Sequence, residues 1–299
     1  MFFIGGSQPG LVNSDVDVYD LKAGTHQYFL NVLPSGGRTF PSFGTCGDID
    51  ATRAVVFGNS NGSNIVRISS SCGIWIVCFV VLLWVCISVK VTANIQTVAS
   101  DYVGTSNLSI LRARSAGTCV TFTSTGNGGL VSLYAGGNSP TTFYTDISMF
   151  VHSNYTKSEL SRGLTVGVHY LSSAVTSDGR YVVFIGGRNG AGATKNIDVF
   201  HTSNVSFYRN IQLNTAMTYH ASAALGPFIY VAGGGITLVQ VIDTRSWIVF
   251  NSPETLSQGS TYNTAVSVPG YAVFFAGGGH ALIDYFTCGN GVRFESSTT

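Results

Sequence analysis

Short apolar runs that end in two glycines recur along the chain. Five copies end in a glycine pair, and a sixth, degraded copy ends in Gly58 and Asn59; the five pairs begin at Gly5, Gly136, Gly186, Gly233 and Gly277. In the last four pairs, the first glycine lies at position 136, 186, 233 or 277, so successive pairs are separated by 50, 47 and 44 residues. A repeat of this length indicates a propeller or a solenoid.

Each copy predicts four short strands. A run of alternating apolar and polar residues follows most pairs, as in Val16–Asp20 and Ile197–Phe200, and this period of two is typical of strands. Turn residues interrupt the apolar residues ahead of the later pairs, at Asp178-Gly179, Gly226-Pro227 and Pro269-Gly270. No long stretch shows a capped helical period outside one apolar segment. The sequence therefore predicts an all-β protein.

Other sequence features recur at similar distances from the glycine pairs. A Leu followed by small or polar residues recurs in five copies, with an Arg close behind it in three, and an aromatic residue follows the predicted third strand at Phe207 and Trp247. Together with the glycine pairs, these features resemble the kelch repeat over nearly the whole chain outside residues 67–89. The degraded copy and the replacement of most fourth-strand tryptophans, as at His26, depart from the kelch pattern.

The kelch resemblance implies a β-propeller with one repeat per blade. We expect residues 1–299 to form a single kelch-type β-propeller of about six four-stranded blades. Glycines suit this fold because strands that end beside a crowded axis need close backbone approach and positive φ. Since Met1 opens at the second strand of a blade, we expect no signal peptide. We also expect incomplete closure unless a longer chain or a partner supplies a strand.

Residues 67–89 interrupt the repeat. The 78-residue step from Gly58 to Gly136 falls to 55 when these 23 residues are removed, so we place an insertion in the second blade, between its second and third strands. Its 22 residues from Ile68 to Val89 carry no charge, which makes it a candidate transmembrane segment. Two alternatives stay open: extra β structure, or sequence that is not native to the protein.

Composition narrows the classes of function. Charged residues make up 10% of the chain and the net charge is +1, so nothing suggests nucleic-acid binding. The six cysteines show no zinc-like spacing and are interpreted as free thiols. No P-loop, GxSxG or HExxH motif occurs, and we expect no catalytic, cofactor-binding or metal-binding residue. The cellular compartment is not indicated.

In kelch-like propellers, partners bind on loops at the mouth of the central channel. The residues that would map there are interpreted as a polar ring that binds a protein or glycan partner: Arg38, Arg114, Arg162, His169, Tyr219 and His220. We therefore predict a non-catalytic interaction scaffold. By contrast, Asp residues of the predicted third strands, among them Asp198, Asp243 and Asp284, are expected to make structural hydrogen bonds to turn amides.

Two alternative functions remain open at this point. Galactose oxidase-like propellers bind copper through Tyr and His, and the repeat places His169 and His220 at matching positions of adjacent units. A copper oxidoreductase needs two or three imidazoles at one point. The third hypothesis, a membrane-tethered recognition domain, rests wholly on residues 68–89.

Overall fold

The structure is a computed structural model that describes ten stretches of the chain. These are residues 2–8, 11–20, 25–29, 53–57, 64–69, 105–107, 116–122, 129–151, 156–278 and 282–287. Among them there is no helix, and every paired strand runs antiparallel to its neighbour. The predicted all-β class is therefore confirmed for the described residues.

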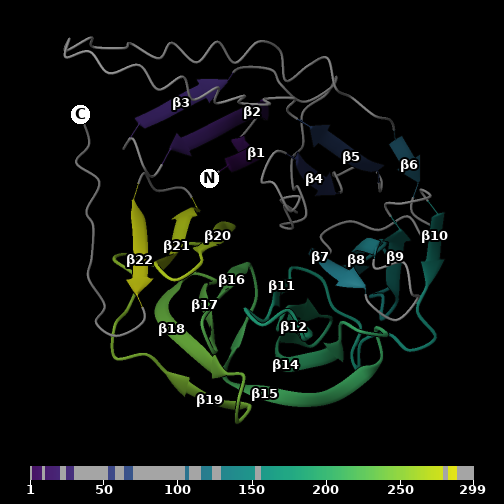
Figure 1. Ribbon diagram of the computed structural model, residues 1–299. Helices are drawn as coiled ribbons and strands as arrows, with labels where there is room; N and C mark the ends of the chain where they lie inside the picture. Colours follow the sequence, from purple (N-terminus) through teal and green to yellow (C-terminus); the bar gives the residue numbers. More distant parts are fainter. Residues whose placement is uncertain are drawn as a thin grey trace, which may run out of the picture.

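The strands form six separate sheets. The first two sheets comprise β1 (Phe2–Gln8), β2 (Leu11–Asp20) and β3 (Thr25–Phe29), then β4 (Arg53–Phe57), β5 (Asn64–Ser69) and β6 (Thr105–Asn107). The third comprises β7 (Ala116–Phe122), β8 (Gly129–Ala135), β9 (Ile147–Val151) and β10 (Thr156–Glu159). In Figure 1 the sheets follow one another around the middle of the view in chain order.

The other three sheets repeat the pattern. The fourth comprises β11 (Ser172–Val175), β12 (Tyr181–Ile185), β14 (Gly192–His201) and β15 (Phe207–Met217), with β13 (Arg188–Asn189) beside β14. The fifth comprises β16 (His220–Leu225), β17 (Phe228–Gly233), β18 (Ile236–Asp243) and β19 (Ile248–Asn251). The sixth comprises β20 (Asn263–Val268), β21 (Ala272–Gly277) and β22 (Ile283–Thr287). The described strands do not join into one closed sheet.

Neighbouring sheets pack face to face, and alternate side chains of one strand pack into the cores on the two faces of its sheet. In β12, Val182 belongs to a core shared with Leu133 of the third sheet, whereas Val183 belongs to a core shared with Val231 of the fifth. Ala232, the next residue of β17, packs toward the sixth sheet. The fourth and fifth sheets, which we call the middle sheets, thus each bury both faces against their neighbours.

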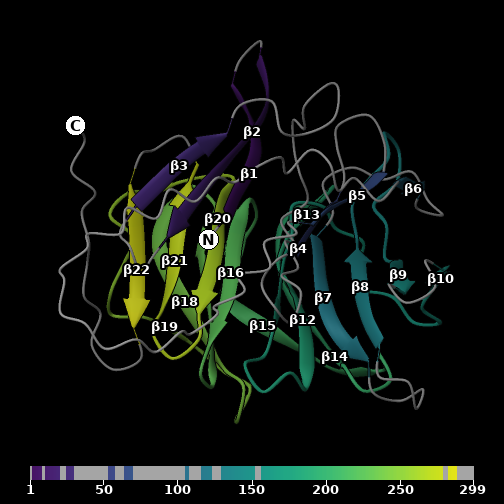
Figure 2. The ribbon, with the colours of Figure 1, turned by 45° about the horizontal axis from the view of Figure 1, so that its top comes forward.

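The first strands of successive sheets meet. Strand β11 contacts β7 on one side and β16 on the other, and β16 contacts β20. Figure 2 shows β16, β20 and β21 standing side by side, with β7 and β8 beyond them. Equivalent strands of four consecutive sheets therefore line the same inner region.

The glycine pairs lie where neighbouring sheets come closest. Gly186 and Gly187 have φ values of +59° and +98°. A Cβ on Gly186 would lie 2.7 Å from the Met217 carbonyl oxygen, and one on Gly187 would lie 2.8 Å from that of His169. Both predicted reasons for glycine, positive φ and close backbone approach, are confirmed here.

Aspartates of the third strands accept hydrogen bonds from the connecting segments. The Asp198 carboxylate accepts a hydrogen bond from the Thr165 amide (2.9 Å), and the Asp284 carboxylate accepts one from Ser257 (3.0 Å). Asp243 accepts from the Arg245 amide at 2.9 Å. The predicted hydrogen bonds to turn and loop amides are thus confirmed at these three residues.

The aspartates do not all share one repeat position, however. Asp198 and Asp284 lie opposite Phe184 and Phe275, each two residues before a glycine pair. In the fifth sheet that place belongs to Gln240, which bonds both the amide and the carbonyl of Thr215 at 3.0 Å. Asp243, the last residue of β18, lies three residues further along the strand.

The predicted place of the apolar insertion, between the second and third strands of its unit, is wrong at its first residues. Strand β5 runs to Ser69, and Arg67 to Ser69 pair with β4, so the first residues of the segment belong to the strand that follows Phe57. The insertion therefore cannot lie before that strand. Its remainder, residues 70–89, lies outside the described residues. In the part of the chain that is described, no helix is long and apolar enough to cross a membrane.

Candidate functional site

Three tyrosines from three successive connections meet at one point. Tyr219 and Tyr262 directly precede β16 and β20, and Tyr170 lies two residues before β11. The Tyr219 ring centroid is 4.0 Å from that of Tyr170 and 4.7 Å from that of Tyr262, and the Tyr170 and Tyr262 centroids are 5.8 Å apart. We call Tyr170, Tyr219 and Tyr262 the tyrosine cluster.

Hydrogen bonds link the main chains of the cluster from sheet to sheet. The Tyr219 amide donates to the Tyr170 carbonyl at 3.2 Å, and the Tyr262 amide donates to the Tyr219 carbonyl at 3.0 Å. All three residues adopt the left-handed backbone conformation, with φ of 53°, 57° and 61°. That conformation costs a residue with a side chain about 1–2 kcal/mol, and such strain is concentrated at functional sites.

The glycine repeat sets the position of each tyrosine. The amides of Gly137, Gly187 and Gly235 donate hydrogen bonds of 2.7, 2.8 and 2.8 Å to the carbonyls of Val168, Met217 and Ser260. Each of these carbonyls lies two residues before a cluster tyrosine. The same contact, repeated three times, therefore brings three equivalent side chains together.

His169 extends the cluster toward the third sheet. Its ring lies 4.4 Å from that of Tyr170 and meets Phe143 edge-on at 5.2 Å. The His169 amide and carbonyl exchange hydrogen bonds with Arg188, at 2.9 and 2.7 Å. The buried His169 ring thus joins the tyrosine cluster to Phe143, while its main chain pairs with that of the exposed Arg188.

His220 follows Tyr219 directly but is buried against the preceding sheet. A Cβ on Gly186 would touch its ring, at 2.8 Å from Cε1. Burial lowers the pKa of His220 to about 4, and the nearby Ile185 carbonyl offsets only part of that shift. Neither ring nitrogen makes a well-formed hydrogen bond within the described part of the chain. His220 therefore stays neutral inside the protein at physiological pH.

The equivalent positions in the neighbouring connections explain this placement. Leu171 follows Tyr170 and packs near Gly136, and Asn263 follows Tyr262 and donates a hydrogen bond to the Ala232 carbonyl at 3.2 Å. Leu171, His220 and Asn263 thus all pack against the preceding sheet beside its first glycine. Their shared role is to join two sheets.

The predicted ring of binding residues is only partly assembled. His169 and Tyr219 lie in or beside the tyrosine cluster, whereas His220 is buried beneath it. Arg162 is placed elsewhere, with its guanidinium 3.7 Å from the centre of the Phe207 ring. Arg38 and Arg114 lie outside the described residues.

One premise of the copper alternative is wrong. His169 precedes its cluster tyrosine and His220 follows its own, so the two histidines are not at matching positions of adjacent units. Among the described residues, no group of three or more His, Cys, Asp or Glu side chains could hold a metal ion.

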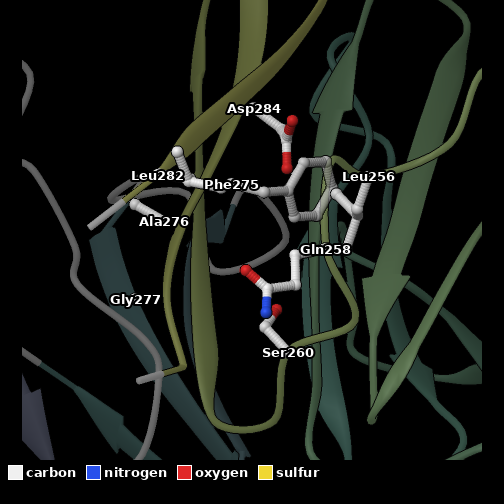
Figure 3. Close-up of a pocket in the computed structure, with 8 residues that line it drawn as sticks. All are labelled: Leu256, Gln258, Ser260, Phe275, Ala276, Gly277, Leu282 and Asp284. Atoms are coloured by element: carbon white, nitrogen blue, oxygen red, sulfur yellow. The ribbon is translucent and has the colours of Figure 1, made fainter. Parts of the chain in front are cut away.

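A small pocket lies at the glycine end of the sixth sheet (Figure 3). It is lined by Leu256, Gln258, Ser260, Phe275, Ala276, Gly277, Leu282 and Asp284. The Asp284 carboxylate is engaged by the amide and hydroxyl of Ser257. The enclosed space suits about one ordered water molecule rather than a substrate.

Comparison of the sequence with models of known protein families and with curated proteins finds no match. The geometry of the described residues alone therefore supports the functional proposal.

Proposed function

We propose that this chain is a kelch-like β-propeller that serves as a non-catalytic binding scaffold, with its partner bound at the tyrosine cluster. The propeller rests on the repeated strand order, on the packing of each middle sheet between two others, and on the contacts of β11 with β7 and β16. The arrangement of the sheets in Figure 1 fits a ring of blades.

The observation that carries the proposal is the convergence of Tyr170, Tyr219 and Tyr262 from equivalent positions. Tyrosine combines a large apolar ring with a hydroxyl and is enriched among residues that dominate binding energies. The rings are partly accessible, and Tyr262 is 39% exposed. The left-handed backbone of all three tyrosines fits a binding role, because such strain is concentrated at functional sites.

The reactive side chains nearest the connections favour binding over catalysis. Asp198 and Asp284 are committed to loop amides, and His220 is buried in neutral form. Catalysis by general acid and base needs such groups within reach of a substrate. Their structural engagement leaves the rings of the tyrosine cluster, with the adjoining His169, as the groups that a partner would meet.

A binding screen tests this function. The purified full chain is offered a glycan array and a peptide-display library, and hits are repeated with Tyr262→Ala and with Tyr271→Ala. Tyr271 is 54% exposed in the turn between β20 and β21, away from the cluster, and is the matched control. We expect binding that Tyr262→Ala weakens by about tenfold and Tyr271→Ala preserves. Binding lost equally in both variants, or no binding at all, would refute the proposal.

A further inference from the structure

The geometry points to a single neutral sugar ring, such as the terminal pyranose of a glycan, as the group held by the tyrosine cluster. This inference rests on the proposed binding function and deepens it. It depends on the size of the cluster, on the chemistry of its side chains and on the lack of formal charge on the described aromatic residues that form it.

The size of the cluster fits one ring. The three ring centroids are at most 5.8 Å apart, so the aromatic surface they share is compact. An extended proline-rich peptide advances about 9 Å per turn and needs a longer row of aromatic grooves. A stable protein interface covers about 800 Å² on each partner, far more than three partly buried tyrosines present.

The shape of the cluster is suited to the two faces of a sugar. The rings are tilted by 46° between Tyr170 and Tyr219 and by 59° between Tyr219 and Tyr262, so the three rings present faces in different directions rather than one flat surface. The face of an aromatic ring carries partial negative charge and attracts polarised C–H groups, which one side of a pyranose presents. Phenol groups can donate and accept hydrogen bonds, as sugar hydroxyls require.

The surroundings favour a neutral ligand. The tyrosine cluster and Phe143 bear no formal charge, and Arg188 is the exposed cation whose main chain pairs with the adjoining His169. Asp198, the buried carboxylate of the fourth sheet, is committed to Thr165 and Asn210. An anionic ligand would lose hydration against ring faces of partial negative charge, whereas a sugar can exchange its hydrogen bonds to water for bonds to phenol groups.

The inference is tested with the purified full chain and defined probes. Methyl glycosides of glucose, galactose, mannose, fucose and N-acetylglucosamine are screened by saturation-transfer NMR, beside sialylated and sulfated oligosaccharides and a peptide-display library. The tightest neutral probe is then titrated calorimetrically. We expect Tyr262→Ala to weaken its binding by about tenfold, Tyr262→Phe by about threefold, and Tyr271→Ala not at all. Circular dichroism confirms that each variant is folded.

The outcomes separate the inference from the proposed function. Binding of a neutral glycoside that responds to Tyr262 but not to Tyr271 supports both. Peptide binding that depends on Tyr262, without sugar binding, overturns the sugar inference and leaves the scaffold function standing. Binding of anionic glycans alone also overturns the inference, and the absence of any ligand overturns both.

Discussion

The amide of Tyr262 donates a hydrogen bond of 3.0 Å to the carbonyl of Tyr219, two residues that occupy the same place in successive connections. The amide of Tyr219 makes the equivalent bond to Tyr170. Three segments distant in sequence are therefore joined in a row at one end of the sheets. The amides of Gly137, Gly187 and Gly235 each donate to the carbonyl two residues before one of the three tyrosines, so the tyrosine cluster is a product of the repeat.

Alanine at Gly186 should destabilise the protein far more than alanine at Gly179. Both glycines have positive φ, +59° and +70°, but a Cβ on Gly186 would meet a backbone carbonyl at 2.7 Å, while one on Gly179 would meet nothing within 4 Å. We expect Gly179→Ala to cost about 1 kcal/mol, the conformational strain alone. Gly186→Ala should cost about 3 kcal/mol or more because two sheets must also separate.

Urea denaturation of both glycine variants measures this difference. Equal losses of unfolding free energy would show that close approach between the sheets is not what requires glycine at position 186.

Removing the Asp198 carboxylate should loosen the connection that enters the fourth sheet. This buried group accepts hydrogen bonds from the Thr165 amide and hydroxyl, both at 2.9 Å, and from the Asn210 side chain at 3.0 Å. Asp198→Ala removes this acceptor from the Thr165 amide and hydroxyl, whereas the Asn210 side chain keeps its bonds to Thr165 and to the Ile197 carbonyl, so we expect a loss of about 3 kcal/mol. The matched control is Asp178→Ala, in the exposed turn before β12, which should cost about 1 kcal/mol or less.

Thermal and urea unfolding compare the two aspartate variants. Amide hydrogen exchange adds a local readout, because the Thr165 amide should exchange faster in Asp198→Ala. An unchanged exchange rate at Thr165 would argue against this role of the carboxylate.

The stability of the protein should fall as the pH drops from about 6.5 to about 4, and His220 should account for much of the fall. The unfolded chain protonates His220 near its ordinary pKa of 6.5, whereas burial holds the folded pKa at about 4. Acid therefore favours the unfolded state across this window, by up to about 3 kcal/mol from this one group. Above pH 6.5 the histidine is neutral in both states and contributes no pH dependence.

His220→Leu tests the assignment, since Leu171 fills the equivalent position of the preceding connection. The variant should fold and should lose less stability than the natural protein between pH 6.5 and 4. Matching pH profiles for the two proteins would show that another group titrates.

The sequence predicted the fold class and the role of the glycines because both follow from local rules. The apolar run before Gly186 and the turn at Asp178 and Gly179 can each be recognised from a few adjacent residues, without knowing what packs against them. The functional residues were harder to identify. Tyr170, Tyr219 and Tyr262 precede Gly186, Gly233 and Gly277 by 16, 14 and 15 residues, so hairpin turns of unequal length hide their equivalence.

Phe207 and Trp247 both follow third strands, as predicted, but they do not occupy equivalent places. Phe207 and Trp247 resemble one another in the sequence, but the left-handed residue in the turn after β14 is Val205, and Trp247 holds that place after β18. Arg162 was placed at the mouth from its distance to a Leu, yet its guanidinium lies over Phe207. Spacing along the chain gives the unit of the repeat, whereas contacts between units depend on packing that spacing does not encode.

The convergence of the three tyrosines is tested most directly by nuclear Overhauser contacts between their rings. The protein is perdeuterated with protonated tyrosine rings, and the signals of Tyr170, Tyr219 and Tyr262 are assigned from single Tyr→Phe variants. The account predicts contacts from Tyr219 to both other rings, at centroid distances of 4.0 and 4.7 Å. A spectrum in which Tyr219 contacts neither ring would contradict it.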